Sequence, residues 1–435
     1  MNRVQLIMFG GIGVIVFLAV LVVFDVIPLG RRETPPAVTI TVWGFEDERL
    51  WQDFVARYAS EFPRVKIVYT KKNPTTYERE LLNALASGVG PDIFTLSNNQ
   101  IITHGDKIFP LPEGAFSFRA RDFRNTFFNA SAEDLVTPEG KIVGIPLTVD
   151  TLALFYNRDF FNSANIASPP KTWEDLVDVS LRLTAFTEVG NIVRSGVALG
   201  TAANIEHAVD ILSALMIETG VELVDRKSWQ SGLAEGKAVL GLSRPAVSAL
   251  SFYSSFADSS KRTYAWSSFF PNSFDAFAEG KTAIVFGYAE DIPRITAKNP
   301  HINFDVASFP QPKDAAIKIY YGRYRFKAVA KQSRNPIESW RFLLWLSGRD
   351  NDKIFAESQF IAPARRDLLG ERPTAEYLEI FYGQVLAART WLIPDENKIN
   401  EIFKEMITSV VNKSASVEDA VGRANVKVNS LLNQP

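Results

Sequence analysis

The segment from residue 38 to residue 96 constrains the fold most, because three short apolar runs alternate in it with amphipathic stretches. The runs are VTITVW (38–43), VKIVYT (65–70) and GPDIFTL (90–96). Each is typical of a β-strand, and the stretches between them repeat their hydrophobic residues at helical spacing. Strands joined through helices require right-handed crossovers. The pattern therefore predicts an α/β fold with a mostly parallel sheet.

The strand and helix pattern resumes after residue 144 and continues to the carboxyl end. Thr172 with Asp175, and Ser416 with Asp419, form capping-box patterns that predict the starts of two later helices. Short strands are predicted at 280–287 and 302–312. A chain of 435 residues is too long for one ordinary core, so two lobes are expected.

Composition excludes several classes of function. The formal net charge of −2, without a long basic run, gives no basis for nucleic-acid binding. The absence of cysteine excludes disulfides, thiolate zinc sites and a lipid-modified cysteine. His104, His207 and His301 lack the spacing of a metal site, so neither a metal nor another cofactor is expected.

The amino terminus is almost wholly apolar from Val4 to Phe24, close to the ~20 residues with which a helix crosses a bilayer. We therefore predict a transmembrane anchor within residues 1–30, in contact with the lipid bilayer through residues 4–24, and a short linker at 31–37. A cleaved secretory signal is the alternative. Its apolar region is usually shorter, ~7–15 residues, and ends at a small-x-small site, which the sequence lacks between residues 21 and 37.

The stretch GIPLTVDTLALFYNRDFF (144–161) places Asp150 in a β-type apolar run. The residues from Ile145 to Val149 alternate, which predicts a half-covered strand with Ile145, Leu147 and Val149 on one face, and Thr148 and Asp150 on the other. A lone buried carboxylate is costly. Asp150 is therefore expected either to reach water or to meet a ligand.

Six stretches, in this order, carry a family resemblance. They are ITVWGFEDERLWQDFVARYASEFPRVKIVY, LLNALASGVGPDIFTLS, GIPLTVDTLALFYNRDFF, PPKTWEDL, FAEGKTAIVFG and SVEDAVGRANVKVNSLL. Together they resemble the carbohydrate-type extracellular solute-binding proteins of bacterial ABC importers, the group that includes maltose-binding protein. The resemblance covers about residues 38–435.

The resemblance implies a two-lobed periplasmic-binding-protein clamp with discontinuous lobes. Lobe 1 would comprise residues 38–149 and about 318–370. Lobe 2 would comprise 150–317 and about 371–435. Asp150 would lie at the hinge, where maltose-binding protein has a glutamate that contacts its ligand. The alternative is that Asp150 pairs with a basic residue and holds the hinge.

Saccharide clefts combine flat apolar faces with polar groups, and the ends of parallel strands commonly supply the polar groups. The expected ligand-binding residues after the first and third strands are Trp43, Phe45, Glu46, Ser97, Asn98 and Asn99. Trp266, Tyr288 and Trp391 are further aromatic candidates by resemblance. For each of them, packing in the core is the alternative.

The stretch YYGRYRFKAVA (320–330) departs from the family, which has a mostly apolar segment there. Arg323 and Arg325 share one strand face, and Tyr324 lies between them on the other. If the arginines point into the cleft, they would suit a carboxylate, sulfate or phosphate on the ligand. If they point outward, they are ordinary solvated charges.

The leading hypothesis is a non-catalytic, membrane-anchored binding protein. On the extracytoplasmic face it would capture a small solute and deliver it to ABC permease subunits, and the aromatic candidates favour a saccharide as that solute. An extracytoplasmic carbohydrate-active enzyme is one alternative, with Asp150 and Glu46 as its carboxylate pair. A ligand sensor acting through a membrane partner is another. The chain lacks a GxxxxGK[ST] motif for nucleotide.

We predict that the full chain stays with the membrane fraction and that a chain starting at Thr34 is soluble, because only the first contains the apolar run. Fractionation followed by amino-terminal sequencing tests this. A mature amino terminus found between residues 25 and 40 would contradict the anchor and favour a cleaved signal.

Overall fold

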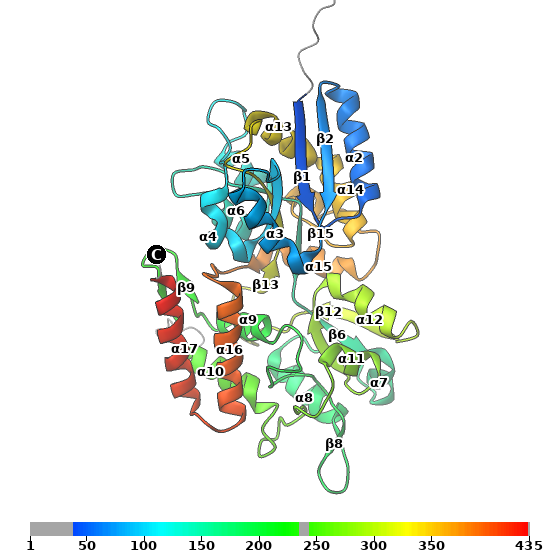
Figure 1. Cartoon of the computed structure of the whole chain (residues 1–435). Coiled ribbons are helices and arrows are strands. Elements are labelled where there is room, and N and C mark those ends of the chain that lie inside the picture. The colour runs from blue at the N-terminus through cyan, green and yellow to red at the C-terminus, as the bar shows by residue number, and fades with distance from the viewer. Residues whose placement is uncertain (1–37, 235–242, 434–435) are drawn as a thin grey trace, which may run out of the picture.

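The chain forms two α/β lobes, one above the other in Figure 1, in a computed structural model that describes residues 38–234 and 243–433. Lobe 1 is built on the sheet that contains β1 (Val38–Gly44), and lobe 2 on the sheet that contains β6 (Ala153–Asn157). The prediction of a two-lobed α/β fold is confirmed.

The sheet of lobe 1 has five strands in the order β2-β1-β3-β14-β4. The other bounds are β2 Val65–Lys71, β3 Ile93–Ser97, β4 Ile145–Pro146 and β14 Arg325–Val329. β1 runs parallel to β2 and β3, whereas β14 runs antiparallel to β3 and β4. The predicted parallel sheet is therefore correct for the first three strands and wrong beyond them, because β14 enters the sheet from the hinge.

Helices cover both the sheet and the hinge side of lobe 1. They are α2 Glu48–Glu61, α3 Pro74–Ala86, α4 Ile101–His104, α5 Ala120–Thr126, α6 Asn129–Leu135, α13 Pro336–Leu346 and α14 Arg349–Gln359. Asp47 begins α2 by accepting the Arg49 N–H. Trp51 of α2 stacks on Tyr69 of β2 with 4.3 Å between ring centroids, which fixes the helix on the sheet.

The central sheet of lobe 2 is antiparallel, in the order β11-β6-β12, with β11 at Ile284–Gly287 and β12 at Phe304–Ser308. Its helices are α7 Arg158–Ser163, α8 Trp173–Leu183, α9 Ala208–Glu218, α10 Pro245–Ser255, α11 Ser273–Ala278, α12 Ile292–Lys298, α16 Glu396–Val411 and α17 Val417–Leu432. Two hairpins complete it, β7 Ala185–Phe186 with β8 Ile192–Arg194, and β9 Val224–Asp225 with β10 Gln230–Ser231.

Side-chain caps start two of these helices where the sequence predicts them. The Thr172 hydroxyl accepts the Asp175 N–H at 3.1 Å, and the Ser416 hydroxyl accepts the Asp419 N–H at 3.1 Å. Each cap satisfies a backbone donor that the first helical turn leaves without a partner. Both predicted capping positions are confirmed.

A third sheet joins the lobes, in the order β15-β5-β13-β16. Its bounds are β5 Thr148–Thr151, β13 Tyr320–Arg323, β15 Ala362–Pro363 and β16 Ala388–Arg389. Helix α15 (Leu378–Gln384) packs against this sheet and against β12. The chain from residue 145 to residue 157 divides into β4, β5 and β6, so the single half-covered strand predicted at 145–149 is wrong. The proposed lobe boundaries stay a prediction.

Across residues 38–234 and 243–433, no helix has the length and apolar content of a membrane-spanning segment. The predicted anchor at Val4–Phe24 and the linker at 31–37 lie outside the described residues.

Candidate functional site

The two lobes meet at the pairing of β5 with β13. These strands run antiparallel, with Thr151 opposite Gly322 and Asp150 opposite Arg323. Because both strands connect the lobes, their side chains lie at the base of the space between them. Asp150 and Arg323 are both candidate site residues and are far apart in the sequence. The strand pairing places them opposite each other.

Asp150 is buried and accepts three backbone N–H groups. Its Oδ1 accepts from Thr151 at 2.9 Å and from Ala289 at 3.1 Å, and its Oδ2 accepts from Glu290 at 3.0 Å. Ala289 and Glu290 belong to η3 (Ala289–Asp291), the short 3₁₀ helix that follows β11. Burial, and then the neighbouring Glu290 charge, raise the pKa of Asp150 to about 7.

Of the two alternatives expected for Asp150, contact with water does not apply in this structure, where its exposure is 6%. Its partners are backbone donors rather than a basic side chain, because η3 turns its N–H groups toward β5. Asp150 anchors the hinge strand to lobe 2. Whether it also contacts a solute stays a prediction.

Arg323 and Arg325 both lie between the lobes and contact acidic side chains. Arg323 reaches Asp210 of α9 at 3.4 Å and Glu396 of α16 at 3.8 Å. Arg325 contacts Glu290 at 3.2 Å. Arg323 is partly buried and Arg325 is exposed, and acidic groups of lobe 2 compensate the charges of both.

Six of the candidate residues line one small cavity of about 50 Å³ at this junction, together with Thr148, Glu290 and Ile361. The six are Ser97, Asn98, Asp150, Arg323, Tyr324 and Arg325. Small-molecule sites usually measure ~300–1,000 Å³. The lobes are thus closed against each other here, and the cavity would have to widen before it could hold a solute.

The loop after β3 contributes to this closed contact. Asn98 Oδ1 accepts the Tyr324 N–H at 3.1 Å, and Asn99 Nδ2 donates to Glu396 at 3.2 Å. Asn99 Oδ1 is buried and has no hydrogen-bond partner among the described residues. Ser97 caps the short helix η1 (Asn98–Gln100), which fixes the direction of both asparagines.

The loop after β1 faces the interior of lobe 1 more than the cleft. Trp43 lies under the Lys72 ammonium, with 3.7 Å from Nζ to the ring centroid. Phe45 packs edge-on against Tyr77 at 4.6 Å. The Arg325 guanidinium lies 5.6 Å from the Phe45 ring centroid. Phe45 therefore contacts a residue of the cleft.

Glu46 is buried and forms an ion pair with Lys327 of β14 at 2.7 Å. Lys327 also donates to Thr95 at 2.8 Å, and Glu46 accepts from Trp51 Nε1 at 3.2 Å. Burial opposes ionisation of Glu46, but the Lys327 ammonium holds the Glu46 pKa below its usual value. Sequence reasoning missed Lys327. Its signal was a lysine inside the apolar run FKAVA, which indicates a buried cation with a partner.

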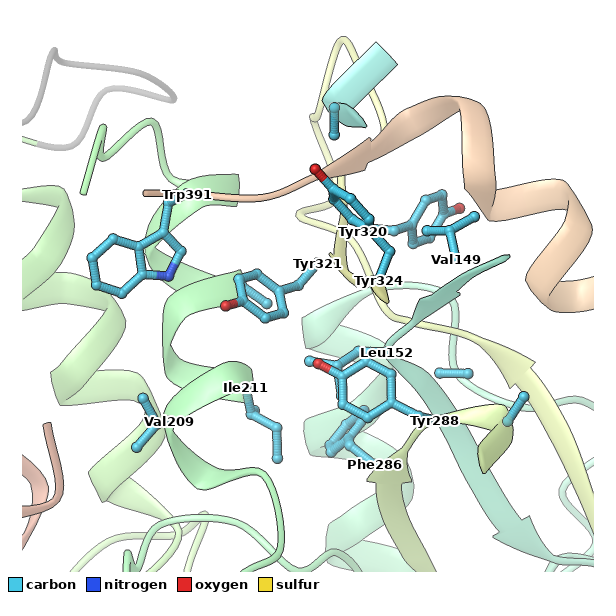
Figure 2. Packing of buried hydrophobic residues seen from close by; sticks show 14 of the residues in the cluster. Val149, Leu152, Val209, Ile211, Phe286, Tyr288, Tyr320, Tyr321, Tyr324 and Trp391 are labelled. Carbon is cyan, nitrogen blue, oxygen red and sulfur yellow. The ribbon is translucent and has the colours of Figure 1, made fainter. Parts of the chain in front are cut away.

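The remaining aromatic candidates are covered by neighbouring side chains, and three of them are seen in Figure 2. The Tyr288 hydroxyl donates to Asp210 at 2.9 Å, and the Tyr324 hydroxyl donates to Asp134 at 2.9 Å. Trp391 packs against Phe403 with ring centroids 6.0 Å apart. Trp266 stacks on Phe270 inside lobe 2, with 4.5 Å between the ring centroids, and does not line the small cavity at the junction of the lobes.

A larger hollow of about 640 Å³ lies between α4 and α6 of lobe 1 and the β9–β10 hairpin of lobe 2. Trp229 and Arg226 project from that hairpin, and Arg226 closes one end by pairing with Asp134 and donating to the Glu133 carbonyl at 2.9 Å. Sequence reasoning missed this region. Its signal was the turn DRKSW (225–229), in which Asp225 accepts the N–H groups of Lys227 and Ser228.

Two α/β lobes that hinge on paired strands, with a hollow between them, define a ligand-binding clamp. The chain belongs to the bacterial extracellular solute-binding protein family, whose sequence profile matches residues 53–377. Members of this family are solute-binding proteins rather than enzymes, as predicted, and the family places the chain outside the cytoplasm.

Individual relatives are distant in sequence. A candidate binding protein of Brucella abortus is 23% identical over 360 residues, which cover 79% of this chain and 80% of that protein. The sugar-binding protein MalE of Xanthomonas citri is 18% identical, with a TM-score of 0.74 over 91% of this chain and 97% of its own. The cyclic alpha-maltosyl-1,6-maltose binding protein of Arthrobacter globiformis is 17% identical, with a TM-score of 0.73 over 91% and 99%.

We predict that Lys327→Met lowers the free energy of unfolding by about 3–5 kcal/mol, because it leaves the Glu46 carboxylate buried without its cation. Urea unfolding measures the change. The double variant Glu46→Gln with Lys327→Met should recover much of the loss. Lys331→Met, at an exposed lysine on the same segment, is the control. Equal effects at positions 327 and 331 would contradict a buried pair.

We predict that Asp150 makes stability fall as the pH rises. Its pKa is about 7 in the folded chain and ~3.9 in the unfolded chain. Between these values only the folded state retains the proton, so this contribution is complete below pH ~4 and is lost as the pH rises through about 7.

The measurement is the unfolding free energy of the native chain minus that of Asp150→Asn, followed between pH 4 and pH 8. It should fall by up to about 1.4 kcal/mol per pH unit within the window. Asp53→Asn, at an exposed carboxylate on α2, is the control. A difference that rises with pH would mean that the three N–H donors keep Asp150 ionised.

Proposed function

We propose that this protein captures a neutral carbohydrate-like solute between its lobes and delivers it to the permease subunits of an ABC importer, tethered to the membrane through Val4–Phe24. It performs no chemistry on the solute. The observation that carries the proposal is the hollow of about 640 Å³ between the lobes, whose size is typical of a small-molecule site.

The charges of this hollow support a neutral solute. Its lining contains two basic side chains, Arg124 and Arg226, and two acidic ones, Glu133 and Asp134. Trp229 supplies a flat apolar face beside these polar groups. Sugar rings present hydroxyl groups at their edge and C–H groups on their faces. The polar side chains of the hollow would bond to the hydroxyl groups, and the Trp229 ring would pack against the C–H groups.

Arg323 of β13 and Arg325 of β14 also support a neutral solute. Arg323 and Arg325 were considered as partners of an anionic ligand, but each contacts a carboxylate of lobe 2. An anionic solute would have to displace these carboxylates. The two solved relatives described above are named for sugars, which agrees with a carbohydrate solute.

Opening and closing would depend on the polar contacts that bridge the lobes. Arg325 with Glu290, Asn99 with Glu396, and Arg226 with Asp134 are such bridges. Arg325 with Glu290 is a partly exposed ion pair, of the kind that contributes about 0–1 kcal/mol, whereas the Asp134 carboxylate that pairs with Arg226 is buried and costs more to separate from its partner. A solute that contacts both lobes would favour the closed form.

We predict that calorimetric titration detects a neutral oligosaccharide among a panel of neutral, phosphorylated and acidic sugars, and that Trp229→Ala weakens its binding by about 2 kcal/mol or more, roughly thirtyfold. Phe269→Ala removes an aromatic ring that is 97% exposed on lobe 2 and is the matched control. Tighter binding of a phosphorylated or acidic sugar would contradict the neutral-solute proposal. Release of product from the saccharide would favour the enzyme alternative.

A further inference from the structure

A second hollow, of about 560 Å³, lies on lobe 2 away from the space between the lobes. Helices α8, α9 and α10 form its walls, and the turn after Gln311 closes one side. Its apolar lining includes Trp173, Val177, Leu215 and Phe252. We call it the α8–α10 hollow. Its size is within the usual range of small-molecule sites.

A carboxylate lies at the base of the α8–α10 hollow. Glu218 is 6% exposed, and its two oxygens accept from Trp173 Nε1 at 2.7 Å and from Gln311 Nε2 at 2.9 Å. Both donors are neutral, and Glu218 forms no ion pair within the part of the chain that the structure describes. Burial raises the pKa of Glu218 well above its usual value. A cation placed in the hollow would offset the cost of burying this charge.

The rim of the hollow is also acidic. Glu174, Asp178 and Asp314 line it with one base, Lys313. Over residues 38–234 and 243–433, none of these four side chains forms an ion pair. Three acids around a partly apolar opening create a negative potential, which raises the local concentration of cations.

The aromatic walls of the α8–α10 hollow indicate which class of cation it would bind. Trp173 and Phe252 pack edge to face with 5.6 Å between ring centroids, and aromatic faces attract ammonium groups. The described residues contain no group of three or more acidic, histidine or cysteine side chains that could hold a metal ion. The lining therefore suits an organic ammonium ion better than a metal ion.

We propose that the α8–α10 hollow binds an organic ammonium ion with an apolar body, its charged nitrogen near Glu218 and its body against Trp173 and Phe252. This site is separate from the proposed saccharide site, and it does not depend on the identity of that solute.

Phenethylammonium and its neutral analogue 2-phenylethanol test the proposal by calorimetric titration of the folded chain at pH 7.5. The ammonium ion should bind about tenfold or more tightly than the alcohol, since only the ammonium ion interacts with the carboxylate. Glu218→Gln keeps the shape of the side chain and should remove this preference. Glu222→Gln, at an exposed carboxylate of lobe 2 outside the hollow, should retain it.

A second variant keeps the test decisive if Glu218→Gln does not fold. Val177→Trp fills the hollow from α8 and should abolish binding of both probes while saccharide binding stays unchanged. Titration of the native chain in two buffers of different ionisation enthalpy should also show proton release on binding, because the ammonium ion favours ionised Glu218.

Equal affinity for the ammonium ion and the alcohol would overturn the proposal. So would undiminished ammonium binding in Glu218→Gln and Val177→Trp, or competition between the ammonium ion and a saturating saccharide. Binding of a lysine-containing peptide without binding of phenethylammonium would also overturn it, since the site would then recognise a protein partner.

Discussion

The antiparallel pairing of β5 with β13 is the interaction on which the arrangement of the two lobes depends, because each strand leaves one lobe and enters the other. Asp150 and Arg323 are opposite each other in this pairing, yet their polar contacts go in different directions. Asp150 accepts backbone N–H groups of η3, whereas Arg323 reaches acidic side chains of α9 and α16. Backbone donors move with the fold that carries them, so the Asp150 contact can persist while side-chain bridges between the lobes break and form.

Charge compensation distinguishes the three hollows. The small cavity at the hinge contains arginines that lobe 2 already pairs with carboxylates. The hollow beside α6 has balanced charges, and the α8–α10 hollow has an excess of acidic groups. The charge of a site favours ligands of complementary charge and disfavours ligands of like charge. The two proposed sites therefore differ in charge, and each would favour a different class of ligand.

The candidate site could be predicted from the sequence only in part. Asp150, Ser97, Asn98, Arg323, Tyr324 and Arg325 do meet around one cavity, as the ends of strands at a lobe junction should. Glu46 was also selected as a ligand-binding candidate, but it pairs with Lys327, which lies 281 positions away. Trp229 and Arg226 were missed because a short turn carries no periodic hydrophobic signal. Trp266 was selected as an aromatic near a motif, and its ring instead fills the interior of lobe 2.

By itself, the sequence determined the alternation of strands and helices, the capped starts of α8 and α17, the two-lobed class of fold and the family. These features depend on local periodicity, on hydrogen bonds across three or four residues, and on the order of short motifs, all of which are written along the chain. Only the tertiary structure decided the direction of β14, the burial of Asp150, the partners of the arginines and the position of the hollows. The physical reason is that a buried polar group is stabilised by whatever donor or counter-charge the fold brings beside it, and for Asp150 one such donor is a backbone N–H group 140 residues further along the chain.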